Sequence, residues 1–109
     1  MDYMTLQEVC VSTGVSRRAI QGYEKIKLVS ATGKTERGHL LYNEEAQNRI
    51  RQIKFYQQLG FALKEIGAII DAPSEILRIA LEKRIKELEK HSKETEALLQ
   101  KAYEVIKTL

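Results

Sequence analysis

The last 36 residues of the chain constrain its fold most, because nothing in them interrupts a helix. From Ser74 to Leu109 there is no proline and no glycine, the two residues that most often break regular structure. At about 1.5 Å per residue, a helix of this length would extend roughly 50 Å. No small domain needs such a length, so the segment 74–109 is predicted to be an extended element separate from the domain at 1–73.

Apolar residues recur along this segment with the alternating four- and three-residue spacing of a coiled coil. Seven of the ten positions on that spacing are apolar, and the other three are Arg84, His91 and Thr95. A lone helix would expose this stripe of apolar residues to solvent. We therefore expect the helix to pair with a second copy of the chain. The alternative is that it folds back on the small domain. The residues expected at the dimer contact are Leu77, Leu81, Ile85, Leu88, Leu98, Ala102, Val105 and Leu109.

Two short helices joined by a tight turn are predicted near the N-terminus. Thr5 and Glu8 fit a capping box, in which each side chain satisfies a backbone donor at a helix start, and this helix should run to about Ser12. After a glycine-bearing turn, Ser16 is a good N-cap for a second helix that ends near Lys25. This order is the signature of a helix-turn-helix. Its shared inner face is predicted to hold Leu6, Val9, Cys10, Val15, Ala19, Ile20 and Tyr23.

Residues 28–42 are predicted to form a wing. Leu28-Val29 and Leu40-Leu41-Tyr42 are short apolar runs on either side of a polar, basic loop that contains glycine. Two such runs are typical of two short strands around a loop.

A second helical pair is predicted at about 44–71. Asn43 is an N-cap followed by two glutamates, which the helix dipole favours, and the helix should reach Leu59. Gly60 then ends it. A compact helix at 63–70 follows, with its isoleucines and Leu63 facing inward.

The composition agrees with one mostly helical globular chain. Its 109 residues carry a net charge of +3, and residues 1–42 hold six basic against four acidic residues. Cys10 is the only cysteine, so no disulfide or thiolate metal cluster can form within one chain. No run of about 18 apolar residues occurs, and we therefore expect a cytoplasmic protein.

Two arginines follow Ser16 at the predicted start of the second helix, where the helix dipole is positive. Cations in that turn are disfavoured by roughly 0.3–1 kcal/mol each, so Arg17 and Arg18 point to an anion that binds there. A DNA phosphate or a guanine edge matches the arginine fork. Gln21, one turn further on, can read an adenine edge. An ordinary solvated helix surface remains the alternative for all three side chains.

The order and spacing of three segments resemble the N-terminal part of the MerR family of bacterial transcription regulators. The segments are "TLQEVCVSTGVSRRAIQGYE" at 5–24, "GHLLY" at 38–42 and "FYQQLGFALKEIGAII" at 55–70. With the long final helix, the resemblance covers essentially the whole chain. It departs from the family at Ala19–Glu24, which lacks one basic and one aromatic residue, and at His39-Leu40, where the family usually has tyrosine-arginine.

The resemblance implies a mostly α-helical, winged helix-turn-helix regulator with an antiparallel coiled-coil homodimer. Such dimers bind inverted-repeat operators in promoters and distort the DNA so that RNA polymerase can engage it. Tyr23 and Tyr42 are expected in the core, with hydroxyls that can also reach a phosphate. Lys64 either holds a phosphate or is solvated. The expected DNA contacts are Ser16, Arg17, Arg18, Gln21, Tyr23, Lys25, Lys34, Arg37, His39, Tyr42 and Lys64.

Two rival classes of function remain beside the regulator. The first is a protein-interaction module, in which the coiled coil is the function and DNA binding is weak or vestigial. The second is an enzyme, which has little support because no nucleophile–base pair, carboxylate pair or phosphate-cradling glycine loop occurs. No cofactor or metal is expected. The chain is either a DNA-binding and dimerisation portion or a short regulator whose signal enters by another route.

Overall fold

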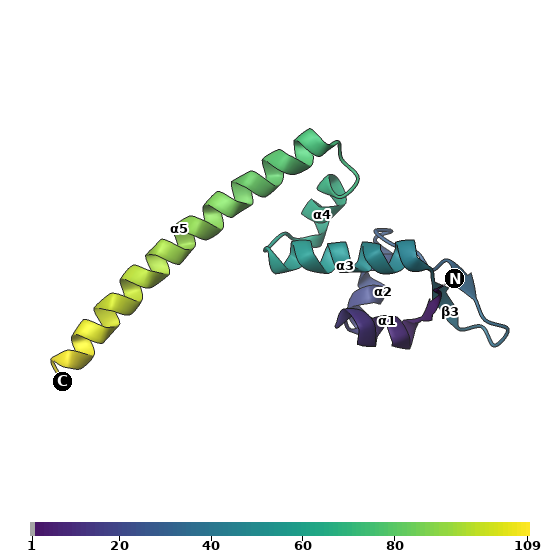
Figure 1. Cartoon of the computed structure of the whole chain (residues 1–109), viewed down its shortest axis with the longest axis horizontal. Coiled ribbons are helices and arrows are strands. Elements are labelled where there is room, and N and C mark those ends of the chain that lie inside the picture. The colour runs from purple at the N-terminus through teal and green to yellow at the C-terminus, as the bar shows by residue number, and fades with distance from the viewer. Residues whose placement is uncertain (1) are drawn as a thin grey trace. The chain divides into compact units, whose positions relative to one another are not determined.

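The computed structural model describes residues 2–109 and divides into two units, one ending at Ile70 and the other comprising Asp71–Leu109. The first unit contains β1 (Met4–Thr5), α1 (Leu6–Thr13), α2 (Arg17–Lys25), β2 (Gly33–Lys34), β3 (Leu40–Tyr42), α3 (Glu44–Gln58) and α4 (Leu63–Ile69), and the second contains α5 (Ser74–Lys107) (Figure 1). The predicted mostly helical class, with a winged helix-turn-helix and a long last helix, is confirmed.

Three helices begin at the N-cap residues that the sequence predicts. The Thr5 backbone N–H donates to Glu8 Oε1 at 2.9 Å and the Glu8 N–H donates to Thr5 Oγ1 at 3.3 Å, which completes the capping box of α1. Ser16 Oγ accepts the N–H of Ala19 at the start of α2. Asn43 Oδ1 accepts the N–H of Ala46 at the start of α3. Local capping chemistry therefore sets these boundaries.

The turn between α1 and α2 depends on Gly14. Its φ of 71° lies in the left-handed region, and its N–H donates to the Cys10 carbonyl at 2.9 Å. From α3, Lys54 Nζ donates to the carbonyl of Thr13 at 2.7 Å and closes the same helix end. The turn is thus fixed by backbone conformation and by a cation at a helix C-terminus, where the dipole favours one.

We expect Gly14→Ala to destabilise the fold and Gly22→Ala to stabilise it. A Cβ at residue 14 would lie 2.9 Å from Lys54 Nζ, and the left-handed conformation itself costs an L-residue roughly 1–2 kcal/mol. At Gly22, inside α2, a Cβ would meet nothing within 4 Å, and replacing a helical glycine with alanine gains roughly 0.5–1 kcal/mol. Urea unfolding of the two variants measures this difference, and equal effects would contradict it.

A three-stranded antiparallel sheet connects the helix-turn-helix to the wing. Its strand order is β1-β3-β2, with Met4 opposite Tyr42 in one pair and Lys34 opposite Leu40 in the other. Strand β1 was not predicted. Because β1 runs directly into α1, the sheet places the start of α1 next to the wing.

The predicted strand at Leu28-Val29 is wrong. The strand that pairs with β3 in the wing is β2 at Gly33–Lys34. The Leu28 N–H donates to the carbonyl of Tyr23 and so closes the C-terminus of α2, where Lys27 adopts a φ of 63°. The Leu28 carbonyl accepts Arg49 Nε at 2.9 Å. Both backbone groups of Leu28 are therefore engaged outside the sheet, and its side chain is buried in the core.

The core of the first unit lies between α1, α2, α3 and α4. Its fully buried aliphatic side chains are Val9, Ile20, Ile50, Ile53 and Ile66. Ile69 is also buried, as predicted, whereas Leu63 and Ile70 are half-buried. The buried polar residue Gln47 donates from Nε2 to the carbonyls of Asp2 and Tyr42, which ties α3 to the N-terminal segment and to β3.

Helix α5 is a single unbroken helix of 34 residues (Figure 1). None of its side chains, all of which the structure describes, is buried. Its exposed large apolar residues include Ile85, Leu98, Leu99, Val105 and Ile106. Arg84, the one charged residue on the predicted stripe, donates to Glu87 at 3.1 Å. The helix thus presents a long apolar surface to solvent in the single chain.

Candidate nucleic-acid interface

Helix α2 presents its polar side chains on its exposed face. Arg17, Arg18, Gln21 and Lys25 are all exposed, whereas Ile20 between them is fully buried. The first turn of α2 contains no acidic residue, and both arginines lie in it. Positive charge therefore gathers at the positive end of this helix, as it would where an anion binds.

Two side-chain hydrogen bonds hold α2 in place on the side opposite its exposed face. Tyr23 is 2% exposed and donates from its hydroxyl to Gln57 Oε1 of α3 at 2.6 Å. The next residue, Glu24, accepts the hydroxyl of the fully buried Tyr42 of β3 at 2.5 Å. Adjacent residues of α2 are thus bonded to α3 on one side and to the wing strand on the other. This fixes the exposed face of α2 relative to the wing.

Both tyrosines have a pKa above the ordinary value for the residue. Burial raises the pKa of Tyr23, and burial together with the nearby Glu24 carboxylate raises the pKa of Tyr42. Below pH of about 10 the hydroxyls are protonated in the folded and unfolded chains alike. Above it, the unfolded chain releases protons that the folded chain retains, so the free energy of unfolding falls as the pH rises.

Replacing Tyr42 with phenylalanine tests this anchor. We expect Tyr42→Phe to lower the free energy of unfolding by about 1.5–3 kcal/mol at neutral pH, since a hydrogen bond to a charged group is lost. The variant should also lose less stability than the parent above pH of about 10. Urea unfolding at neutral and alkaline pH measures both. An unchanged neutral-pH stability would show that the bond to Glu24 contributes nothing.

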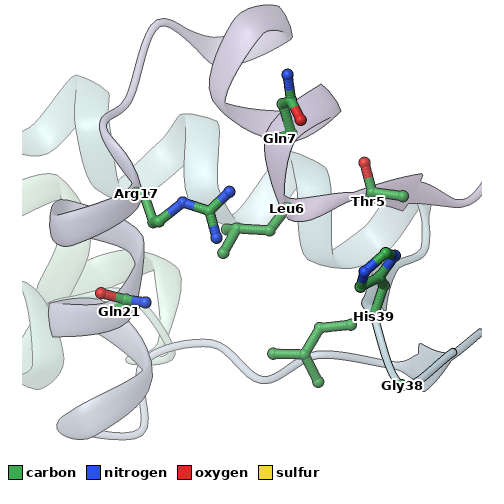
Figure 2. A pocket seen from close by; sticks show the side chains of 8 residues that line it. Thr5, Leu6, Gln7, Arg17, Gln21, Gly38 and His39 are labelled. Atoms are coloured by element: carbon green, nitrogen blue, oxygen red, sulfur yellow. The ribbon is translucent and has the colours of Figure 1, made fainter.

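A hollow of about 490 Å³ lies between the start of α1, the first turns of α2 and the wing. It is lined by Thr5, Leu6, Gln7, Arg17, Gln21, Gly38, His39 and Leu40. In Figure 2 the Arg17 side chain extends from α2 towards Leu6, and His39 lies beside Thr5. The hollow therefore combines an arginine, two amides and an imidazole with two leucines.

The predicted site residues divide between this hollow and the surrounding surface. Arg17, Gln21 and His39 line the hollow together. The remaining exposed candidates, none of which lines it, are Ser16, Arg18, Lys25, Lys34, Arg37 and Lys64. Tyr23 and Tyr42 lie in the core, with hydroxyls bonded to other side chains. A role for any of these residues in DNA contact stays a prediction.

The sequence does not indicate the other lining residues. Thr5, Leu6 and Gln7 belong to the start of α1, and they reach the wing because Thr5 of β1 pairs with Leu41 of β3. A strand of two residues shows no alternation of polar and apolar side chains. The capping box at Thr5 marks the helix start but not its neighbour across the sheet.

Residues 2–109 contain no group of three histidine, cysteine or acidic side chains placed to hold a metal ion. None of the helices in this range is both long and apolar enough to cross a membrane.

Two protein-family profiles match the chain. One, described as MerR HTH family regulatory protein, matches residues 4–73, and the other, described as MerR, DNA binding, matches residues 47–101. The first therefore covers the helix-turn-helix, the wing and the second helical pair. The second extends over much of α5.

Two relatives also match the chain in sequence. The chain is 34% identical over 82 residues to nodulation protein NolA of Bradyrhizobium diazoefficiens, covering 75% of this chain and 34% of that protein. It is 30% identical over 95 residues to the HTH-type transcriptional activator mta of Bacillus subtilis, covering 87% of this chain and 37% of that protein. The chain thus spans about a third of the length of these relatives.

A solved structure agrees over almost the whole chain. The crystal structure of MtaN, the N-terminus of the Bacillus subtilis multidrug transporter activator, has a TM-score of 0.74 at 27% identity. The match covers 94% of this chain and 97% of that one. The fold, the family profile and these relatives agree with the residues that suggested the resemblance. The chain belongs to the MerR HTH family of regulatory proteins.

Proposed function

We propose that the chain is a sequence-specific DNA-binding transcriptional regulator that acts as a homodimer and is not an enzyme. The observation that carries this proposal is the exposed face of α2, on which Arg17, Arg18 and Gln21 lie together at a helix start. Arginine pairs with guanine and glutamine with adenine in the major groove. The two hydrogen bonds from Tyr23 and to Glu24 support the proposal because they hold this face in one orientation.

Basic residues outside the first turns of α2 would position the protein on the duplex. Lys34 and Arg37 on the wing, Lys25 at the end of α2 and Lys64 in α4 are all exposed. Contacts of this kind, to phosphates, fix orientation without reading sequence.

The stripe on α5 supports an antiparallel arrangement of two copies. Its alternating spacing is symmetric about residue 93. An antiparallel partner in this register places Leu88 opposite Leu98 of the partner subunit and Leu81 opposite Val105 of the partner subunit. The polar layer of His91 and Thr95 then lies at the centre, and apolar layers lie on both sides of it.

A parallel pair fits the same stripe less well. Each stripe residue would then face its own copy, so that Arg84 would meet Arg84 of the partner subunit, and like charges at such a contact are destabilising. In the antiparallel register Arg84 faces Ala102 of the partner subunit, with Glu87 of its own chain bonded to it. The charges on this stripe therefore favour the antiparallel dimer.

We further propose that the dimer binds an inverted-repeat operator in a promoter, in the cytoplasm, and acts on transcription through RNA polymerase. Two copies related by a two-fold axis present two α2 helices in opposite directions. Such a pair reads two half-sites in inverted orientation. Distortion of the promoter DNA would then allow the polymerase to engage it.

The salt dependence of DNA binding tests the function against the protein-interaction module. A regulator that neutralises about six phosphates should lose roughly a thousandfold in affinity between about 50 and 200 mM salt. Binding would be measured by fluorescence anisotropy with duplexes selected from a random pool. If no duplex is enriched, or if affinity is indifferent to salt, the coiled-coil module is the correct function.

A further inference from the structure

We propose that Gly22 determines part of the DNA sequence specificity, because the space beside it receives the C5-methyl group of a thymine. This rests on the proposed DNA-binding function and names a base that α2 reads in addition to those at its arginines and Gln21. Gly22 lies inside α2, one residue after Gln21 and one turn after Arg18. It therefore belongs to the part of the helix that a duplex would approach.

Nothing within residues 2–109 requires a glycine at this position. Gly14, Gly38 and Gly60 have a positive φ, and Gly22 does not. A Cβ at Gly22 would meet nothing within 4 Å, so no neighbouring element packs against the missing side chain. A glycine inside a helix is less favourable than an alanine. The chain thus keeps a destabilising residue, and the reason for it lies in a molecule that approaches α2 from outside.

The surroundings of Gly22 combine apolar surface with positive charge. Ile26 follows one turn later, and its side chain is 49% exposed although it is large and apolar. The Ile26 N–H donates to the Gly22 carbonyl at 3.4 Å. Arg18 and Lys25 are exposed, and residues three or four apart are neighbours on a helix surface. Gly22 and Ile26 therefore form an apolar spot with a cation on either side of the glycine.

The thymine methyl group is the feature of a base edge that fits this spot. It is the apolar group that a base pair displays in the major groove, among polar donors and acceptors. The flanking cations favour a polyanion over an uncharged apolar partner. Gln21 can read an adenine, and the thymine paired with that adenine presents its methyl group in the same groove. An A·T pair at Gln21 thus brings such a methyl group towards the next residue of the helix.

Replacing Gly22 with alanine should weaken DNA binding while the fold becomes no less stable. The added methyl group would occupy the space that the thymine methyl group takes in the complex. One extra methyl group in such a space costs about tenfold or more in discrimination, and a dimer meets this cost at two half-sites. Fluorescence anisotropy with a duplex enriched by the unmodified protein from a random pool measures the loss.

Deoxyuridine in place of thymine identifies the group that Gly22 receives, because it removes the C5-methyl group and nothing else. It would be placed at one thymine position of each half-site at a time. At one such position it should weaken binding by the unmodified protein by about fourfold per half-site, as expected for one lost apolar carbon. At the same position it should restore binding by Gly22→Ala, since the protein then supplies the methyl group that the DNA lacks.

Gly67→Ala is the matched control. Gly67 is also an exposed glycine inside a helix, and its Cβ would lie 3.6 Å from Leu28 Cδ2, an ordinary contact. This variant should bind the thymine and deoxyuridine duplexes as the unmodified protein does. Urea unfolding separates a contact with DNA from a role in folding. A Gly22→Ala protein that binds weakly and also unfolds more easily would make Gly22 a structural residue and overturn the inference.

Failure of this inference is distinguishable from failure of the proposed function. If no duplex is enriched, the function itself is wrong. If a duplex is enriched, three results overturn the assignment at Gly22 and leave the function standing. They are a half-site without thymine, normal binding by Gly22→Ala, and a Gly22→Ala protein whose binding no deoxyuridine substitution restores.

Discussion

Replacing Leu88 and Leu98 with lysine is expected to convert the dimer to monomers. In the antiparallel register Leu88 faces Leu98 of the partner subunit, and this pair occurs once on each side of the central polar layer. One double variant therefore changes four side chains in the dimer. Burying a leucine contributes about 1.5–3 kcal/mol, and four of them contribute about 6–12 kcal/mol. A dimer of ordinary affinity cannot withstand the loss of that much binding free energy. Sedimentation velocity measures the mass.

A matched variant separates this effect from added charge. Ala97→Lys with Gln100→Lys introduces the same two cations on α5, at positions that lie off the stripe. Both residues are exposed, so this variant should remain a dimer. A Leu88/Leu98 variant that also keeps the dimer mass would contradict the proposed interface, and equal dissociation of both variants would show that charge alone is responsible.

Arg18→Ala is expected to weaken specific DNA binding by about 1–3 kcal/mol per half-site, and therefore by about 2–6 kcal/mol for a dimer. If Arg18 reads a base edge, discrimination at one position of each half-site should flatten. If it holds only phosphate, the loss should be similar for all sequences, and the salt slope should decrease by about one unit per contact. Anisotropy titrations with the selected duplex and its point variants measure both.

Stability gives an independent test of the same residue. Arg18 is exposed in the first turn of α2, where a cation opposes the helix dipole. Its removal should leave the free energy of unfolding unchanged or raise it by roughly 0.3–1 kcal/mol. Arg78→Ala removes the same charge from an exposed position of α5 and should change DNA affinity little. An Arg18→Ala protein that binds normally but unfolds more easily would make Arg18 a structural residue.

The sequence predicts the helices well because their ends depend on local chemistry. Thr5, Ser16 and Asn43 bond to backbone donors three residues away, and Gly14 adopts the conformation that a tight turn requires. Such contacts need no knowledge of the rest of the fold. The same holds for α5, whose continuity follows from the absence of proline and glycine.

The sheet could not be predicted in the same way. Strands β1 and β2 have two residues each, too few for a periodic pattern. Leu28-Val29 has the composition of a strand, but the end of α2 and Arg49 use the backbone of Leu28. Contacts between distant parts of the chain therefore overrode local preference.

The sequence predicted only some residues of the candidate site, and it did not predict the site's shape. Arg17 and Gln21 follow from their place at a helix start. Their position opposite His39 depends on the pairing of β1 with β3 and on the bond between Tyr42 and Glu24. These contacts join residues far apart in sequence, and no spacing along the chain reveals them.

Selection of bound DNA from a random pool tests the central claim most directly. Two copies joined through α5 should present two α2 helices to one face of the duplex. The enriched sequences should therefore contain one half-site twice, in inverted orientation and at a fixed spacing. Enrichment of a single half-site, of direct repeats, or of no sequence at all would contradict a dimeric, operator-reading regulator.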